Sequence, residues 1–192
     1  MLRHRSLATL ALAITLPFGR TSAQTQVIGF EGLAGLVPES YENLTWSTTP
    51  FNFWHVALSG SLFRPVSGLA NAASEELSFI TFSRPGESFT LNSIFLSVFL
   101  ATAPERIFDV EVTGWFEGQL RFETRFALDP INMVKHDFNW TGIDQVEMIA
   151  TRGRLLVDDI SITATPEPAT MALVATGLVG VFGGRRLKRR KS

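Results

Sequence analysis

Short runs in which aromatic and β-branched residues alternate with polar ones fill the middle of the chain. Runs of this kind, separated by Gly, Pro, Asn and Asp, are typical of β-strands with one buried face. The pattern predicts strands at residues 26–31, 44–47, 51–58, 61–66, 77–82, 88–100, 107–116, 119–128, 134–140, 145–150 and 154–164. So many short strands in one stretch predict an all-β domain over residues 24–164, folded as a β-sandwich.

The clearest local pairing is a hairpin. Glu117-Gly118 separates two alternating runs and fits a tight two-residue turn. The apolar positions of each arm should then share one face, as period-two alternation requires. These positions are Phe108, Val110 and Val112 in the first arm and Leu120, Phe122, Thr124 and Phe126 in the second.

Two segments need a choice between alternatives. Residues 68–76 are rich in Ala, which favours helix, so this stretch predicts either a short helix or a loop. Residues 91–100 are strongly apolar but are interrupted by Asn92, Ser93 and Ser97, and they are too few to cross a bilayer. We expect them to form a central strand with both faces buried.

Residues 1–23 have the pattern of a secretory signal peptide. Arg3, His4 and Arg5 form a basic start, residues 7–16 are almost entirely apolar, and small residues lead to Ala23. The apolar run is too short for a membrane-spanning helix, which needs about 20 residues. We expect cleavage after Ala23 and export of the remaining chain.

Residues 165–192 combine three features in order. Pro166-Glu167-Pro168 precedes the uncharged residues 169–184, and a basic tail occupies residues 185–191. The uncharged stretch predicts a single transmembrane helix at about 169–184, roughly 24 Å long against a hydrocarbon core of about 30 Å. Arg185 and Arg186 would snorkel to the membrane surface, the basic tail would stay in the cytoplasm, and residues 24–165 would lie outside.

This tail resembles a PEP-CTERM sorting signal of Gram-negative bacteria. The resemblance rests on Pro166, Glu167 and Pro168, on the Gly-rich apolar helix, and on the cluster that begins at Arg185 and Arg186. It implies that an exosortase, a membrane-embedded cysteine transpeptidase, recognises and processes the tail. Organisms with such signals make exopolysaccharide and often grow as biofilm. An ordinary single-pass anchor would differ only in that no processing would follow.

Composition removes several classes of function. The chain has no Cys, which excludes disulfides, thiolate metal sites and a cysteine nucleophile. Residues 24–165 carry eight Lys or Arg against seventeen Asp or Glu, a net charge of −9. An acidic body without a basic stripe disfavours nucleic-acid binding and favours solubility and divalent-cation bridging to polyanionic polysaccharide. Similar tails are also labelled an ice-binding-protein C-terminal motif, but no regular Thr repeat for ice binding is visible.

Catalytic chemistry is sparse. His55 and His136 are the two His residues of the body, both on predicted strands, and no nucleophile elbow, zinc-binding His-Glu-x-x-His or phosphate loop is present. We therefore expect a protein that is not an enzyme and that has no cofactor apart from a structural calcium considered next.

Three short segments of the body carry a second resemblance. They are residues 30–46, the hairpin at 110–126, and residues 138–160, which end in Val157-Asp158-Asp159-Ile160. Together they resemble the galactose-binding-like jelly roll of exported bacterial proteins and carbohydrate-binding modules. The resemblance implies a jelly-roll-like β-sandwich, and a structural calcium that would place Glu31 and Asp158 or Asp159 near one ion. Alternation along a strand would turn one aspartate inward, where it would otherwise cap backbone amides.

Aromatic rings provide the remaining candidates. Tyr41, Trp46, Trp54, Trp115 and Trp140 are the residue types that stack on sugar rings, although most rings in so aromatic a domain are expected in the core. Tyr41 and Trp46 lie in the loop-rich opening, and we expect these two to be exposed for sugar contact. The sequence thus predicts a protein that is membrane-anchored before processing and then at the cell surface or extracellular. It would bind or organise exopolysaccharide; the alternative is a structural matrix or adhesion protein with no small-ligand site.

Overall fold

The computed structural model describes residues 23–49, 55–58, 64–99 and 108–164. Within these ranges the chain forms strands and no helix, so no described segment is a helix that could cross a membrane. The strands are β1 (Thr25–Ile28), β2 (Ser40–Tyr41), β3 (Leu44–Thr49), β4 (His55–Leu58), β5 (Ala70–Ala73), β6 (Phe79–Ser83), β7 (Phe89–Phe99), β8 (Phe108–Phe116), β9 (Gln119–Leu128), β10 (Val134–Ile143), β11 (Gln145–Ala150) and β12 (Arg154–Ala164). The predicted signal peptide, apart from Ala23, and the predicted transmembrane helix lie outside the described residues.

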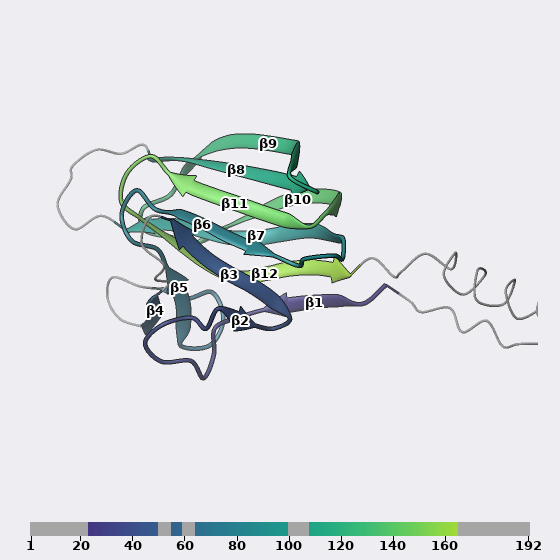
Figure 1. Ribbon diagram of the computed structural model, residues 1–192. Coiled ribbons are helices and arrows are strands. Elements are labelled where there is room, and N and C mark those ends of the chain that lie inside the picture. Colours follow the sequence, from purple (N-terminus) through teal and green to yellow (C-terminus); the bar gives the residue numbers. More distant parts are fainter. Residues whose placement is uncertain (1–22, 50–54, 59–63, 100–107, 165–192) are drawn as a thin grey trace, which may run out of the picture.

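The strands form two sheets that face each other as the layers of a sandwich (Figure 1). Sheet A has the order β10-β7-β12-β5-β4, with β1 also paired to β12, and sheet B has the order β2-β3-β6-β11-β8-β9. The predicted all-β sandwich is therefore confirmed. Strands β9 and β10, consecutive in the chain, form edges of different sheets on the same side of the sandwich.

The core lies between the sheets and is built from side chains of both. Its largest fully buried members include Phe30, Phe82, Phe89 and Phe108. Strand β7 pairs with β10 on one side and β12 on the other, and Leu91, Leu96 and Val98 within it are fully buried. The apolar run at residues 91–100 is thus a central strand up to Phe99, as its composition predicts.

The hairpin between β8 and β9 forms as expected, but one of its side chains lies on the opposite face from the one predicted. Glu117 and Gly118 both have positive φ, 51° and 73°, and Phe116 pairs with Gln119, as a two-residue type I′ turn requires. A register shift follows Gly114: Phe122 pairs with Gly114, but Leu120 pairs with Trp115. The extra residue of this bulge turns Leu120 to the face opposite Phe122, so the prediction that both share one face is wrong.

Two strand predictions also need correction. Ala70–Ala73 forms strand β5, buried between β12 and β4, where the Ala-rich composition favoured a helix or loop. Pairing with two neighbouring strands outweighs intrinsic propensity, which is worth well under about 1 kcal/mol per residue. The described end of the predicted strand 61–66 is not a strand, because residues 64–69 form the loop that enters β5.

Candidate functional site

Trp46 is a core residue, and the expectation that it is exposed is wrong. Its side chain is 3 % exposed, its Nε1 donates a hydrogen bond to the Tyr41 carbonyl at 2.9 Å, and its ring packs 5.3 Å from Phe82. Tyr41 is half-buried, and its hydroxyl donates to the Gly29 carbonyl at 2.8 Å. Burial raises the pKa of Tyr41, with the charges of Glu42 and Glu31 acting in the same direction. Both rings tie the N-terminal segment to the sandwich.

The two aspartates of β12 reach the same loop. Asp158 Oδ2 accepts hydrogen bonds from the backbone N–H groups of Val66 at 2.7 Å and Ser67 at 3.3 Å, and Asp159 Oδ1 accepts one from Ser67 Oγ at 2.7 Å. Simple alternation would separate these side chains, but Asp159 has φ 41° and the register with β7 shifts after Asp158. This bulge, invisible in the pattern, turns both carboxylates toward one segment.

Glu31 holds the next part of the same loop. Its carboxylate accepts the backbone N–H groups of Leu69, at 3.0 Å, and Ala70, at 3.1 Å. A Cβ at Gly68 would lie 2.1 Å from this carboxylate, and Gly68 has φ 54°, so only glycine fits there. Glu31, Asp158 and Asp159, which we call the acidic anchor, therefore fix the entry into β5.

Asp158 is the most perturbed ionisable group of the acidic anchor. It is fully buried, and burial raises its pKa to about 6. The amides of Val66, Ser67 and Asp159 oppose the shift by stabilising the carboxylate, whereas the charge of Asp159 adds to it.

The acidic anchor does not form a cation shell in this arrangement. Calcium takes six to eight oxygen ligands around one centre, but five of the six anchor oxygens already accept hydrogen bonds from the loop or the adjacent backbone. Among the described residues no group of three His, Asp or Glu is placed to hold a metal ion. What is observed is the alternative in which an inward aspartate caps backbone amides; calcium stays a prediction.

The outer face of sheet B brings together side chains from four strands. Trp115 pairs with Gln145, Thr113 with Glu147 and Glu111 with Ile149 across β8 and β11, and Glu111 pairs with Arg125 of β9. Directly opposed residues of paired strands share a face. Phe79 of β6 lies at the same hollow.

We name this hollow surface the outer trough. One part, of about 200 Å³, is lined by Phe79, Glu111, Thr113, Trp115, Glu147, Met148 and Ile149. A second part, of about 320 Å³, shares Phe79, Glu111 and Ile149 and continues to Asp109, Arg125 and Thr151. The two parts adjoin, so the surface is elongated across the sheet.

Polar contacts fix the side chains of the outer trough. The Trp115 indole N–H donates to Thr113 Oγ1 at 2.9 Å, which holds the ring against its own strand. Glu147 accepts a hydrogen bond from Gln145 Nε2 at 3.0 Å, and Arg125 forms an ion pair with Glu111. A held aromatic ring beside oriented carboxylates and a guanidinium can contact both the apolar and the hydroxyl faces of a sugar.

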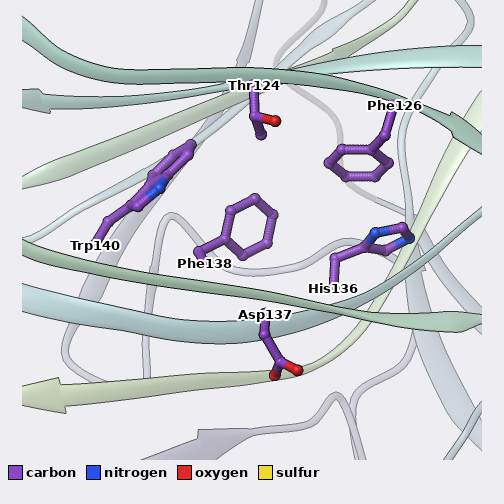
Figure 2. Close-up of a pocket in the computed structure, with 6 residues that line it drawn as sticks. All are labelled: Thr124, Phe126, His136, Asp137, Phe138 and Trp140. Carbon is purple, nitrogen blue, oxygen red and sulfur yellow. The ribbon is translucent and has the colours of Figure 1, made fainter.

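A second hollow, which we name the edge slot, opens between β9 and β10. It has a volume of about 150 Å³ and is lined by Thr124, Phe126, His136, Asp137, Phe138 and Trp140. Figure 2 shows Thr124 and Phe126 on one strand above it, with His136, Phe138 and Trp140 rising from the other. Asp137 extends away from the rings and pairs with Lys135 at 2.7 Å.

The rings of the edge slot are arranged in contacting pairs. Phe126 stacks on His136 with centroids 3.9 Å apart, and Phe138 meets Trp140 edge to face at 4.8 Å. Phe122 stacks on the Trp140 ring at 5.3 Å and 9°. His136 Nε2 is buried with no hydrogen-bond partner. Burial lowers the pKa of His136, and the negative charge of Asp137 offsets part of this effect.

Sequence reasoning named Trp115 and Trp140 among its aromatic candidates but preferred Tyr41 and Trp46. The structure places the first two at hollows and ties the second two to the N-terminal segment. The carboxylates of the outer trough were not among the predicted site residues, because the registers that join β6, β11 and β8 have no local signal in the sequence. The predicted sorting residues Pro166, Glu167, Pro168, Arg185 and Arg186 lie outside the described residues.

Comparison with solved structures returns carbohydrate-binding modules. The CBM22-1 xylan-binding domain of Paenibacillus barcinonensis Xyn10C is 12% identical with a TM-score of 0.45, over 74% of this chain and 95% of that one. The C-terminal family 22 module of Clostridium thermocellum Xyn10B is 16% identical with a TM-score of 0.43, over 73% and 92%. The CBM32 of AlyQ, in complex with 4,5-unsaturated mannuronic acid, is 11% identical with a TM-score of 0.38, over 66% and 98%. Sequence identities and TM-scores this low do not assign a ligand to this chain.

No curated protein sequence matches the chain. A family model does match the segment in which Pro-Glu-Pro, an uncharged stretch and a basic tail follow one another. The match covers residues 164–190 and begins at the last residue of β12. Residues 164–190 are a PEP-CTERM protein-sorting motif.

Proposed function

We propose that the protein is an exosortase-sorted surface protein whose sandwich binds a polysaccharide chain along the outer trough. The PEP-CTERM motif implies export, a membrane-anchored precursor and processing by an exosortase. It says nothing of what the folded domain binds. The proposal for that domain rests on one observation: Trp115, fixed by Thr113, lies in an elongated hollow lined by carboxylates.

The shape of the outer trough supports a chain as ligand rather than one ring. Its two adjoining parts have volumes of about 200 and 320 Å³, and the larger part alone reaches the range of about 300 to 1,000 Å³ usual for ligand sites. Trp115 lines the first part and Phe79 lines both, so aromatic contact is available along the hollow. A linear polysaccharide would bury several rings there.

The charges of the outer trough favour a neutral chain. Asp109, Glu111 and Glu147 face one cation, Arg125, which is already paired with Glu111. A polyuronate would meet a surplus of like charge, in a domain whose residues 24–165 already carry −9. Neutral sugar hydroxyls can donate to the carboxylates without that repulsion.

Binding without catalysis is the activity proposed. Glu111 is held by Arg125 and Glu147 by Gln145, so each acid is oriented for hydrogen bonding to a hydroxyl. We assign no acid–base pair, and the protein would retain or organise polysaccharide at the cell surface.

The test is affinity electrophoresis and calorimetry of the full-length chain with xylan and mixed-linkage β-glucan as neutral probes and alginate as a polyanionic probe. Trp115→Ala should weaken binding to a neutral chain by about tenfold or more, the loss expected for an aromatic contact of about 1.5 kcal/mol. Glu147→Gln should weaken it less. Phe95→Ala is the matched control, because Phe95 lies half-buried on the other sheet between core residues Ile94 and Leu96.

No binding to any of the chains would leave the structural matrix or adhesion role. Binding that Trp115→Ala and Phe95→Ala weaken equally would place the site elsewhere. Preference for alginate over the neutral chains would contradict the charge argument.

A further inference from the structure

The edge slot and the outer trough lie on opposite faces of one strand. Along β9, Arg125 pairs with Glu111 on the outer face, whereas Phe126 and Thr124 line the slot between the sheets. Alternation along the strand keeps the two sets of side chains apart. The edge slot is therefore a separate place of contact with solvent.

The size of the edge slot suits one six-membered ring. A cavity of about 150 Å³ is the volume that accommodates a benzene molecule in another protein interior, and the slot has this volume. It is bounded by rings on several sides: Phe126, Phe138 and Trp140 all contribute faces or edges (Figure 2). It is too small for the several rings of a chain held side-on.

The polar groups of the edge slot exclude a purely apolar occupant. His136 Nε2 is buried without a hydrogen-bond partner, a state that costs free energy unless a ligand or water supplies the partner. Thr124 adds a hydroxyl at the same hollow. A ligand with both an apolar ring face and ring hydroxyls matches these groups, whereas an aromatic hydrocarbon would offer no hydrogen bond to the Thr124 hydroxyl or the His136 imidazole.

Charge argues against an anion in the edge slot. Asp137 is the one carboxylate that lines it, and Lys135, the nearby cation, is paired with Asp137 at 2.7 Å. Burial keeps the pKa of His136 low, so its imidazole is neutral and can exchange hydrogen bonds with a hydroxyl. No unpaired cation is therefore offered to a phosphate or a uronate.

We infer that the edge slot is a second ligand site, which binds a single neutral pyranose ring such as a chain end or a branch. The ring lies against Trp140 and Phe138, and its hydroxyls bond the Thr124 hydroxyl and the His136 imidazole. With the outer trough, this gives the domain two separate sugar contacts on one protein. Such a protein could join two polysaccharide segments instead of merely adhering to one.

The test uses methyl glycosides as probes of a single ring: methyl β-D-xyloside, methyl β-D-glucoside and methyl β-D-galactoside, titrated against the full-length chain by saturation-transfer NMR. A ligand of this size should bind with a Kd of about 1 mM. Thr124→Leu fills the hollow, and His136→Phe keeps the stacked ring while removing the nitrogen. Each should weaken the best glycoside by at least about tenfold, a loss of about 1.4 kcal/mol.

Two controls separate this inference from the proposed function. Trp115→Ala should lose the polysaccharide chain yet keep the methyl glycoside, and His136→Phe should do the reverse. Melting temperatures show that each variant is folded, and His136→Phe should melt no lower than the parent because it removes a buried unpaired nitrogen. The inference fails if no glycoside binds the parent protein at concentrations well above about 1 mM, if His136→Phe binds it unchanged, or if Trp115→Ala alone abolishes it.

Discussion

The Trp140 ring lies directly against the backbone of Gly114. A Cβ at position 114 would come within 2.9 Å of Trp140 Cε3, closer than real Cβ atoms approach a neighbour, and within 3.3 Å of Ile143 Cγ2. The Trp140 ring thus packs between strand β10 of sheet A and the backbone of strand β8 of sheet B, and the indole of the edge slot takes its position from this contact.

Gly114→Ala should therefore destabilise the fold. Alanine is ordinarily the better strand residue, by about 0.5 to 1 kcal/mol, but here it would push the Trp140 ring and cost about 1 to 3 kcal/mol by overpacking. Urea unfolding followed by tryptophan fluorescence measures the change. Gly29→Ala is the control, because its added Cβ would have its nearest contact at an ordinary 3.6 Å; equal stability of the two variants would show that the contact is not tight.

The turn of the β8–β9 hairpin offers a stabilising change. Glu117 has φ 51°, a conformation that Asn adopts far more readily than Glu, and the backbone N–H of Glu117 donates to Asp144 whatever its side chain. Glu117→Asn should raise the free energy of unfolding by about 0.5 kcal/mol, whereas Gly118→Ala, at φ 73°, should lower it by about 1 kcal/mol. Thermal unfolding of both variants tests this prediction, and a lower stability of Glu117→Asn than of the parent would contradict it.

Asp158 should make stability depend on pH in the direction opposite to most carboxylates. Its pKa is raised to about 6, so the folded state binds a proton more tightly than the unfolded state does. The stabilisation is complete below about pH 4 and is lost as pH rises through about 6, a change of about 3 kcal/mol. The parent should therefore lose about 3 kcal/mol of unfolding free energy relative to Asp158→Asn as the pH rises from 4 to 7. Urea unfolding of both proteins across this range measures the change.

Asp129 provides a control of opposite sign for that measurement. The backbone amides of Asn132 and Ile131 lower its pKa, so its contribution is present above the unfolded value and is lost as pH falls. The free energies of unfolding of Asp129→Asn and the parent should therefore be most similar at acidic pH. Parallel pH curves for the parent and Asp158→Asn would show that burial does not perturb this carboxylate.

Calcium at Glu31, Asp158 and Asp159 can be tested on the same variants. Anchoring by amides alone predicts equal melting temperatures in EDTA and in calcium, because the carboxylate oxygens are already bonded to the loop. A calcium-dependent rise in melting temperature that Asp158→Asn abolishes would show that the loop rearranges to admit the ion, since a ligand bound to the native state alone stabilises it. Calcium bound there would also lower the pKa of Asp158, because a nearby cation favours the charged carboxylate.

Local signals account for what the sequence predicted well. The Glu117-Gly118 turn and the alternation on both sides of it determine the hairpin within some twenty adjacent residues, and its strands appear at β8 and β9 with bounds within a residue of those expected. Strand β7 is recognisable from its strongly apolar composition. Neither feature depends on a partner far away in the chain.

The features that failed depend on distant partners or on bulges. Ala70–Ala73 becomes a strand because β12 and β4 pair with it, and Trp46 is buried because Phe30 and Phe82 pack on it. The bulges at Asp159 and after Gly114 each turn one side chain to the unexpected face, moving Asp159 to the loop and Leu120 to the side of Trp115. Period-two alternation has no means of marking such an extra residue.

Strand β12 sets how the domain would carry mechanical force. Its last residue, Ala164, leads directly into the sorting motif, and the strand lies inside sheet A with β7 on one side and β5 and β1 on the other (Figure 1). A tether pulling from that end would load the hydrogen bonds to β7, from Arg154 to Ala164, together along the strand instead of opening them one by one. If the domain binds polysaccharide as proposed, flow past the cell would thus load a strand that is hydrogen-bonded on both sides.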